Sequence, residues 1–315
     1  MISLFLNVAV CQLGGRMDFW IHFIRGRLFG SLLGAYQGGG LPVGGRSRRP
    51  GAGCNPRIVM AFLMIGGAIA MHYLGTTKHE NEFTGRVQRL ALATEQEEVA
   101  MGLQAAPQMI REMGGEHPDP RARALVESVG ARLIQTTAVN ETRYPFDFHL
   151  LADDLTVNAF ALPGGQIFIT SALLKRLKSE DQLAGVLGHE IGHVVGRHSN
   201  EQMAQQGLWT GIARGVGLLL SDGQSSGGLQ VADMLAQVRL KSYGRDDELE
   251  SDRLGLRFMA QAGYDPAALI SVMEILASAS GGGGGPEFLS THPSPENRIE
   301  KIKEEIARLE DRGAK

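Results

Sequence analysis

Cysteine is almost absent from this chain of 315 residues, and the two cysteines, Cys11 and Cys54, both lie near the N-terminus. The remainder of the chain therefore has neither a disulfide framework nor a thiolate metal site. An excess of one charge is also lacking, because the formal net charge is only -3, which argues against nucleic acid as the main partner. Aromatic residues make up 6% and hydrophobic residues 43%, a composition typical of a globular protein.

The first 57 residues differ from the rest of the chain. The stretch 38–53 is rich in glycine, arginine and proline, a composition typical of a flexible tether. Cys11 follows Val10, where a lipoprotein signal would carry a small residue, so we disfavour such a signal. We expect residues 1–57 to be a disordered or low-complexity N-terminal extension.

A run of 17 residues without charge, Ile58–Leu74, follows this extension. As a helix it would be roughly 25 Å long, the short end for a membrane span. Four arginines precede it, at positions 46, 48, 49 and 57. By the positive-inside rule the N-terminus stays cytoplasmic. We therefore expect residues 58–74 to be a transmembrane anchor, with the bulk of the chain on the extracytoplasmic side of a cell envelope. An uncleaved signal sequence and a buried core helix are the alternatives.

The periodicity of the remaining sequence predicts mostly helix with a short stretch of strand. Strand alternation is limited to 146–150 and to a hairpin at 157–170 that turns at Pro163-Gly164-Gly165. The expected helices are 95–113, 119–139, 179–198, 201–220, 229–240, 245–261, 266–278 and 295–312. The sequence thus predicts an α+β fold, mainly α, with a small β-sheet, in a domain over 83–315. For the segment 201–240, plain core packing is favoured over a lid or a membrane-surface contact.

His189 and His193 lie four residues apart in the segment His189-Glu190-Ile191-Gly192-His193. On a helix this spacing places both imidazoles on one face, one turn apart, where they can bind one zinc ion. The Glu190 carboxylate would reach a water on that zinc. Zinc lowers the pKa of such a water to about 7, and the glutamate accepts its proton as the water attacks a carbonyl. The segment predicts a zinc hydrolase with Glu190 as its general base.

A catalytic zinc also needs a third protein ligand and an open fourth position. The metzincin pattern would place a histidine ten residues after His189, but that residue is Ser199, and we interpret His198 as a helix-end or supporting histidine. A later helix offers Glu248 and Asp252, four residues apart on one face. One can bind zinc while the other orients a ligand imidazole, and we favour Glu248 as the ligand. The competing explanation is that acidic residues favour a helix N-terminus.

Four segments occur here in the order of a known family. They are NAFALPGG (158–165), HEIGHVVGRH (189–198), ELESD (248–252) and THPSPENRI (291–299). Together they resemble the membrane-associated gluzincin peptidase family, which includes the CaaX prenyl protease, HtpX and BepA-like zinc metallopeptidases. The resemblance covers roughly residues 90–312. One departure is Ser251, where the family usually has alanine, and both residues are small.

The resemblance implies a zincin-like metallopeptidase fold with one Zn2+ per chain. It implies that His189, His193 and Glu248 hold the metal and that Asp252 orients one of these ligands without binding the metal.

The resemblance adds two further roles. It implies that His292 lies near the zinc, where it stabilises the oxyanion or caps the metal in a resting form, and that Arg298 acts with it. From the residues alone, His292 is a loop histidine, and a purely structural role stays open. The resemblance also implies an edge strand that binds substrate backbone through Asn158, Ala159 and Phe160.

These observations predict a zinc-dependent endopeptidase that hydrolyses misfolded or misassembled envelope proteins. Protein or peptide substrates and a membrane bound through the N-terminal helix are the expected partners. The alternative is a chaperone-like binding protein with a latent zinc site that His292 plugs. A purely structural zinc site is disfavoured, because Glu190 would then have no role.

Overall fold

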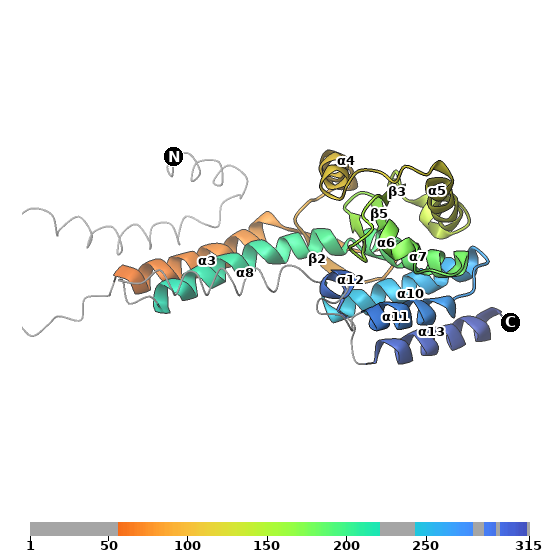
Figure 1. Cartoon of the computed structure of the whole chain (residues 1–315). Coiled ribbons are helices and arrows are strands. Elements are labelled where there is room, and N and C mark those ends of the chain that lie inside the picture. The colour runs from red at the N-terminus through yellow and green to blue at the C-terminus, as the bar shows by residue number, and fades with distance from the viewer. Residues whose placement is uncertain (1–55, 221–242, 280–286, 294–296, 314–315) are drawn as a thin grey trace, which may run out of the picture. The chain divides into compact units, whose positions relative to one another are not determined.

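The computed structural model describes residues 56–220, 243–279, 287–293 and 297–313 (Figure 1). These residues all belong to one compact unit that begins at Cys54. The expected N-terminal extension therefore lies outside the described residues, apart from the two residues that start the first helix. The helix expected at 229–240 also lies outside them. The fold is mainly helical with a small sheet, as the sequence predicts.

The apolar run forms helix α3 (Pro56–Gly75). Its stretch Ile58–Gly75 is long and apolar enough to cross a membrane, and only 6% of it is buried. Large side chains such as Phe62, Leu63 and Met71 are exposed by 63–76%. This exposure is inconsistent with a buried core helix, one of the alternatives for this segment.

A two-stranded antiparallel hairpin follows α3 and is not predicted from the sequence. Its strands are β1 (Thr77–Glu80) and β2 (Val87–Leu90). Two buried amides attach it to the end of a central helix, because Asn81 donates to the Val195 carbonyl and Gln88 to the Gly196 carbonyl, both at 2.8 Å. The hairpin thus satisfies carbonyls that a helix C-terminus leaves without partners.

Two helices precede the main sheet and begin within one residue of the expected ranges 95–113 and 119–139, but the second ends at Gln135, four residues before the expected end. Helix α4 (Glu95–Glu112) begins with a capping box between Thr94 and Glu97. Helix α5 (Pro120–Gln135) begins with Asp119 as N-cap and proline in its first position. A short 3-10 turn, η2, extends over Ala138–Glu141.

The main sheet has three strands in the order β3-β5-β4. They are β3 (Asp147–Leu151), β4 (Ala159–Leu162) and β5 (Gln166–Thr170). Strand β3 is parallel to β5, and β4 and β5 form the predicted antiparallel hairpin. Gly164 and Gly165 make its turn with φ angles of +83° and +102°, which favour glycine. Strand β4 therefore lies at an edge of this sheet.

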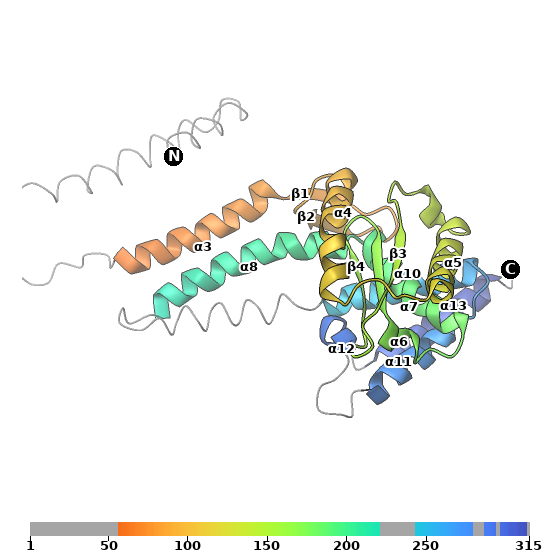
Figure 2. The same ribbon diagram turned by 45° about the horizontal axis from the view of Figure 1, so that its top comes forward.

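The remaining elements surround α7 (Glu180–Val195), whose residues from Gln182 onward are buried on every side. The sheet and α5 contact it on one side, and α10 and α11 contact it on the other (Figure 2). Those two helices are α10 (Arg245–Gln261) and α11 (Ala268–Ser278). The other elements are α6 (Ser171–Leu174), α8 (His198–Leu220), α12 (Glu287–Thr291) and α13 (Arg298–Gly313).

Small residues let α7 and α10 approach closely. A Cβ atom on Gly192 would lie 2.8 Å from the Ser251 carbonyl oxygen, and one on Gly188 would lie 3.3 Å from that of Gly255. The close crossing brings the histidines of α7 next to the acidic residues of α10. Ser251, a small residue, is fully buried at this crossing.

Helix α8 differs from expectation. Core packing is the expectation for residues 201–240, of which the structure describes 201–220. The described side chains of this part belong to neither buried hydrophobic cluster, although Ala204 is buried. Instead α8 lies along α3 in both views (Figures 1 and 2). Trp209 and Val216 are exposed by 37% and 39%.

Candidate metal centre

Helix α7 carries the two motif histidines into the interior of the domain. His189 and His193 are each 1% exposed, and Glu190 between them is fully buried. The Nε2 atoms of the two histidines lie 3.1 Å apart. Two imidazole nitrogens so close together, both with lone pairs, repel each other unless a cation lies between them and binds both.

Glu248, on α10, completes a triangle with these histidines. Its Oε2 atom lies 3.5 Å from Nε2 of His189, and its Oε1 atom lies 3.4 Å from Nε2 of His193. Burial alone would raise the pKa of Glu248, but His292 and hydrogen bonds from the two histidines hold it well below its usual range. The carboxylate is therefore ionised, which is the form that binds a metal ion.

His292 supplies a third nitrogen and thus a fourth donor. Its Nδ1 atom lies 2.9 Å from Oε1 of Glu248 and 3.3 Å from Nε2 of His189. The donor atoms of these four residues, His193 included, lie within 4.8 Å of one another, and all four side chains are buried. His292 thus occupies the position at which a catalytic metal site would be open.

The donor set suits zinc. Imidazole nitrogens and a carboxylate are ligands that zinc prefers, and metal–ligand distances near 2.1 Å in a tetrahedron give donor separations of about 3.4 Å. The donor separations given above, which join all pairs except His193 and His292, range from 2.9 to 3.5 Å. Oε2 of Glu248 is also buried without a hydrogen-bond partner among the described residues. A metal ion bound at this point would satisfy it.

Asp252 and Arg298 contact the donor residues but are not candidate metal donors themselves. Asp252 lies 2.9 Å from Nδ1 of His189, which leaves Nε2 of that ring for a metal. Arg298 binds both oxygens of Asp252, at 2.6 and 2.8 Å. Its Nη1 atom also lies 3.0 Å from Glu248 Oε2, in an ion pair without hydrogen-bond alignment. The contacts of Arg298 are thus with the carboxylates and with His189, and the expected cooperation with His292 is indirect.

His198 supports the other motif histidine. Its Nδ1 atom lies 2.9 Å from Nδ1 of His193, and its Nε2 atom lies 2.9 Å from Glu250. His198 is fully buried and lies outside the group of four donors. This position agrees with the interpretation of His198 as a supporting histidine.

Sequence reasoning missed two aromatic residues that enclose the cluster. The Tyr243 ring stacks on His193 with a centroid distance of 4.0 Å, and the Phe288 ring stacks on His292 at 4.4 Å. Tyr243 precedes α10 and Phe288 lies in the short helix α12. Neither shows helical periodicity or ligand chemistry, so the sequence contains no signal for them.

Glu190 is the reactive group without a partner in the described part of the chain. Both of its carboxylate oxygens are buried and lack a hydrogen bond there. The Nε2 atom of His292 lies 3.7 Å from Oε1. Burial raises the pKa of Glu190 above its usual range. A carboxylate with free lone pairs and an elevated pKa is suited to accept a proton.

The predicted substrate strand is indeed an edge strand and contacts α7. Ala159 is buried, while Phe160 is half-buried and stacks on Phe168. Asn158, just before β4, is buried, and its side-chain oxygen has no partner within the described ranges. The backbone of α12 reaches this region, since the Phe288 amide donates to the Val157 carbonyl at 3.3 Å. Substrate binding by Asn158, Ala159 and Phe160 stays a prediction.

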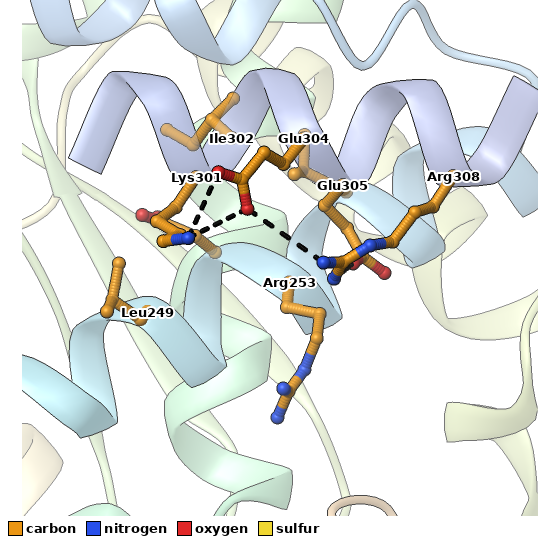
Figure 3. A pocket seen from close by; sticks show the side chains of 9 residues that line it. Leu249, Arg253, Lys301, Ile302, Glu304, Glu305 and Arg308 are labelled. Atoms are coloured by element: carbon orange, nitrogen blue, oxygen red, sulfur yellow. Dashed lines mark hydrogen bonds and ion pairs between the residues drawn. The ribbon is translucent and has the colours of Figure 1, made fainter. Parts of the chain in front are cut away.

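A small pocket between α10 and α13 lies beside Asp252 (Figure 3). Its charged side chains are largely paired with one another, because Lys301 binds Glu304, and Arg308 lies 3.1 Å from Glu305. The groups suited to chemistry therefore remain those of the buried cluster.

Comparisons with known proteins show that the chain is similar to metallopeptidases. The beta-barrel assembly-enhancing protease of Escherichia coli (strain K12) is 34% identical over 212 residues, which are 64% of this chain and 43% of that protein. The mitochondrial metalloendopeptidase OMA1 of Schizosaccharomyces pombe is 36% identical over 185 residues, 57% of this chain and 51% of that protein. The match thus spans about half or less of these relatives' own length.

The relative from Arabidopsis thaliana, also a mitochondrial metalloendopeptidase OMA1, is 37% identical over 151 residues, which are 47% of this chain and 29% of that protein. A family model matches residues 120–306, a range that contains all four candidate metal donors. The chain therefore belongs to peptidase family M48.

Proposed function

We propose that this chain is a zinc-dependent endopeptidase of the cell envelope that hydrolyses misfolded or misassembled proteins. The observation that carries this proposal is the convergence of His189, His193 and Glu248 beside the unpaired carboxylate of Glu190. Membership of a peptidase family supports peptide bonds as the target. We propose residues 83–315 as the peptidase domain, whose first strand, β2, pairs with β1.

Each residue of the cluster has a distinct part in the proposed reaction. Zinc held by His189, His193 and Glu248 would polarise the scissile carbonyl and lower the pKa of water in the site. Glu190 accepts the proton of the attacking water and returns it to the leaving amine. Asp252 holds the His189 ring so that its Nε2 atom faces the metal.

We propose that substrate binds in extended form along β4. A peptide that adds as a strand there hydrogen-bonds through its backbone, so binding tolerates many sequences, as suits misfolded clients. Asn158, Ala159 and Phe160 would face that peptide. The buried oxygen of Asn158, which has no partner in the described residues, is available to it.

We also propose that α3 anchors the chain in a membrane, with the peptidase domain on the extracytoplasmic side. The support is its length, its freedom from charge between residues 58 and 74, and the outward orientation of its large side chains. Four arginines at positions 46–57 favour a cytoplasmic location for the N-terminal side.

A second candidate function is a chaperone-like binding protein with a latent metal site. The observation that favours it is the Nδ1 atom of His292 in the fourth donor position, together with the complete burial of Glu190. Substrate cannot reach the metal until His292 and α12 move. If they remain in place, the chain binds clients without cleaving them.

Zinc stoichiometry and casein cleavage by the full chain test the proposal. We expect one zinc per wild-type chain and measurable cleavage. Glu190→Gln should keep the zinc and lose activity by about 10²- to 10⁴-fold, because only proton transfer is removed. Glu180→Gln, exposed in the first turn of α7, is the matched control and should keep both.

His292→Ala separates the two candidate functions. A rise in cleavage would identify His292 as a plug, and a fall would identify it as an assisting group. If wild type and His292→Ala are both inactive while the aggregation of a client protein is still suppressed, the endopeptidase proposal fails and the binding function stands.

A further inference from the structure

The interface between α3 and α8 is made of small residues. A Cβ atom added to Gly211 would lie 2.3 Å from that of Ala68, and one added to Gly215 would lie 2.4 Å from the Ile65 side chain and 3.0 Å from the Ala61 carbonyl oxygen. Gly207, Gly211 and Gly215 recur every four residues along α8. The backbones of the two helices approach closely at Gly211 and Gly215, over about one turn of α8, whereas Gly207 has nothing within 4 Å among the described residues.

The large side chains of the pair point outward. Phe62, Leu63 and Met71 of α3 are exposed by 64%, 63% and 76%, and Trp209 and Val216 of α8 by 37% and 39%. A helix pair in water hides its large apolar side chains between the helices. This pair has largely the opposite arrangement, with glycine, alanine and Ile65 inside and the larger aromatic and aliphatic side chains named above outside. Such an arrangement is typical of helices surrounded by lipid, where packing rather than the hydrophobic effect holds helices together.

The composition of α8 changes at the point where this arrangement begins. Its first nine residues, His198–Gln206, are mostly polar, whereas the fourteen from Gly207 to Leu220 contain a single charged residue, Arg214. The apolar part is about 21 Å long, too short to span a bilayer but long enough to enter one beside α3.

Two aromatic residues, Trp209 and Tyr73, lie at a similar height along the helix pair. The contacts of Gly211 with Ala68 and of Gly215 with Ile65 show that the helices are antiparallel. In this register Trp209 and Tyr73 lie within about one turn of each other, at the end nearer the peptidase domain. Arg89 lies over the Tyr73 ring at 4.5 Å. Tryptophan and tyrosine are enriched where a helix crosses the membrane interface.

Arg214 is compatible with this placement. It lies five residues beyond Trp209, a depth of about 7 Å. Because side chains on a helix tilt toward its N-terminus, the arginine is directed back toward the interface, where its charged group can remain hydrated.

We propose that the apolar half of α8, Gly207–Leu220, is embedded in the same bilayer as α3, so that two packed helices rather than one hold the peptidase domain at the membrane. This inference rests on the proposed membrane anchoring of α3 and extends it. Since α8 begins at His198, which contacts His193, the metal centre would lie about 16 Å from the interface marked by Trp209. Substrates would then be cut close to the membrane surface.

Tryptophan quenching by brominated phospholipids tests the proposal on the full chain in phosphatidylcholine vesicles. The chain has two tryptophans, Trp20 and Trp209, and both are replaced by phenylalanine. A single tryptophan is then introduced as Val216→Trp, as Leu63→Trp in α3, or as Gln205→Trp on the polar, exposed part of α8. All variants carry Glu190→Gln, so no result depends on activity.

We expect lipids brominated deep in the acyl chains to quench Val216→Trp and Leu63→Trp alike and to leave Gln205→Trp unaffected. Quenching of Leu63→Trp alone would overturn the placement of α8 while the anchor stands, and this is also the result if a second copy of the chain covers α8. Quenching of neither would overturn both the placement of α8 and the proposed anchor.

Discussion

The Nδ1 atom of His198 lies 2.9 Å from the Nδ1 atom of His193. One nitrogen must donate and the other accept, and His198 also contacts Glu250 through Nε2, at 2.9 Å. If His198 donates to Glu250 from Nε2, its Nδ1 atom accepts from His193. His193 is then protonated on Nδ1 and presents a free lone pair on Nε2 toward the other donors.

Removal of His198 should therefore weaken metal binding. We expect His198→Ala to lower zinc affinity by about 10- to 100-fold, because the His193 ring loses the partner that fixes its tautomer and orientation. Competition with a chromophoric chelator measures the affinity. His149→Ala is the control, since His149 contacts Gln166 on the sheet. Equal affinity in the two variants would show that His198 does not support the site.

The close crossing of α7 and α10 predicts that substitution of two glycines of α7 has different effects on stability. In Gly192→Ala the new methyl group would lie 2.8 Å from the Ser251 carbonyl oxygen, so the helices must separate. We expect a loss of about 1–3 kcal/mol in the free energy of unfolding, as for other overpacked sites, with weaker zinc binding. Chemical denaturation and metal titration measure the two effects.

Gly185→Ala is the matched control for this prediction. Its methyl group would meet the Leu269 side chain at 3.4 Å, an acceptable contact. The variant should be neutral or slightly more stable, because alanine favours helix over glycine. A similar loss of stability in both variants would show that the approach of α7 to α10 does not limit the packing.

The buried pair of Arg298 and Asp252 predicts that substitutions of the two residues have non-additive effects on stability. Asp252→Asn leaves the Arg298 guanidinium buried without its closest anion, and we expect a cost of about 3–5 kcal/mol in the free energy of unfolding. The double variant Asp252→Asn/Arg298→Met should recover part of this loss. Denaturant unfolding of the four proteins completes the cycle, and additive effects would contradict the pairing. Glu304→Gln, which breaks an exposed pair with Lys301, should change stability little.

The glycine interface of α8 predicts position-dependent effects within a single helix. Gly211→Leu and Gly215→Leu place a side chain against α3, whereas nothing in the described residues lies within 4 Å of a Cβ atom at Gly207. We expect the first two variants to separate the helices and to accelerate tryptic cleavage after Arg214 in detergent. Gly207→Leu should be cleaved at the wild-type rate. Equal rates in all three variants would argue against the packed pair.

The helical elements and the hairpin β4–β5 are predictable from the sequence because their signals are local. Thr94 with Glu97 and Asp119 with Pro120 mark two helix starts, and Gly164 marks the turn. The β1–β2 hairpin has no such signal, since its strands, TKHE and VQRL, do not alternate apolar and polar residues. It is held by the contacts of Asn81 and Gln88 with the end of α7, which depend on the folded structure.

The candidate site likewise has residues that the sequence predicts and residues that it does not. The spacing of His189 and His193 and the pair Glu248 and Asp252 express helix geometry, so the sequence reveals them. The contacts of His198 with Glu250 and of Tyr243 with His193 join segments about 50 residues apart. The position of α8 is not predictable for a related reason, because its apolar side chains resemble core residues. Only the structure shows that the helix lies against α3 and that its large side chains face outward.

The four candidate donors come from three separate stretches of the chain, on α7, α10 and the loop after α12. A growing polypeptide presents the histidines of α7 about a hundred residues before His292 is made. The proposed third ligand, Glu248, is made about sixty residues after His189, so metal capture must wait until α10 has folded onto α7. Such an order would protect the cell, because a chain that has not yet made α10 could not act as a protease on its neighbours.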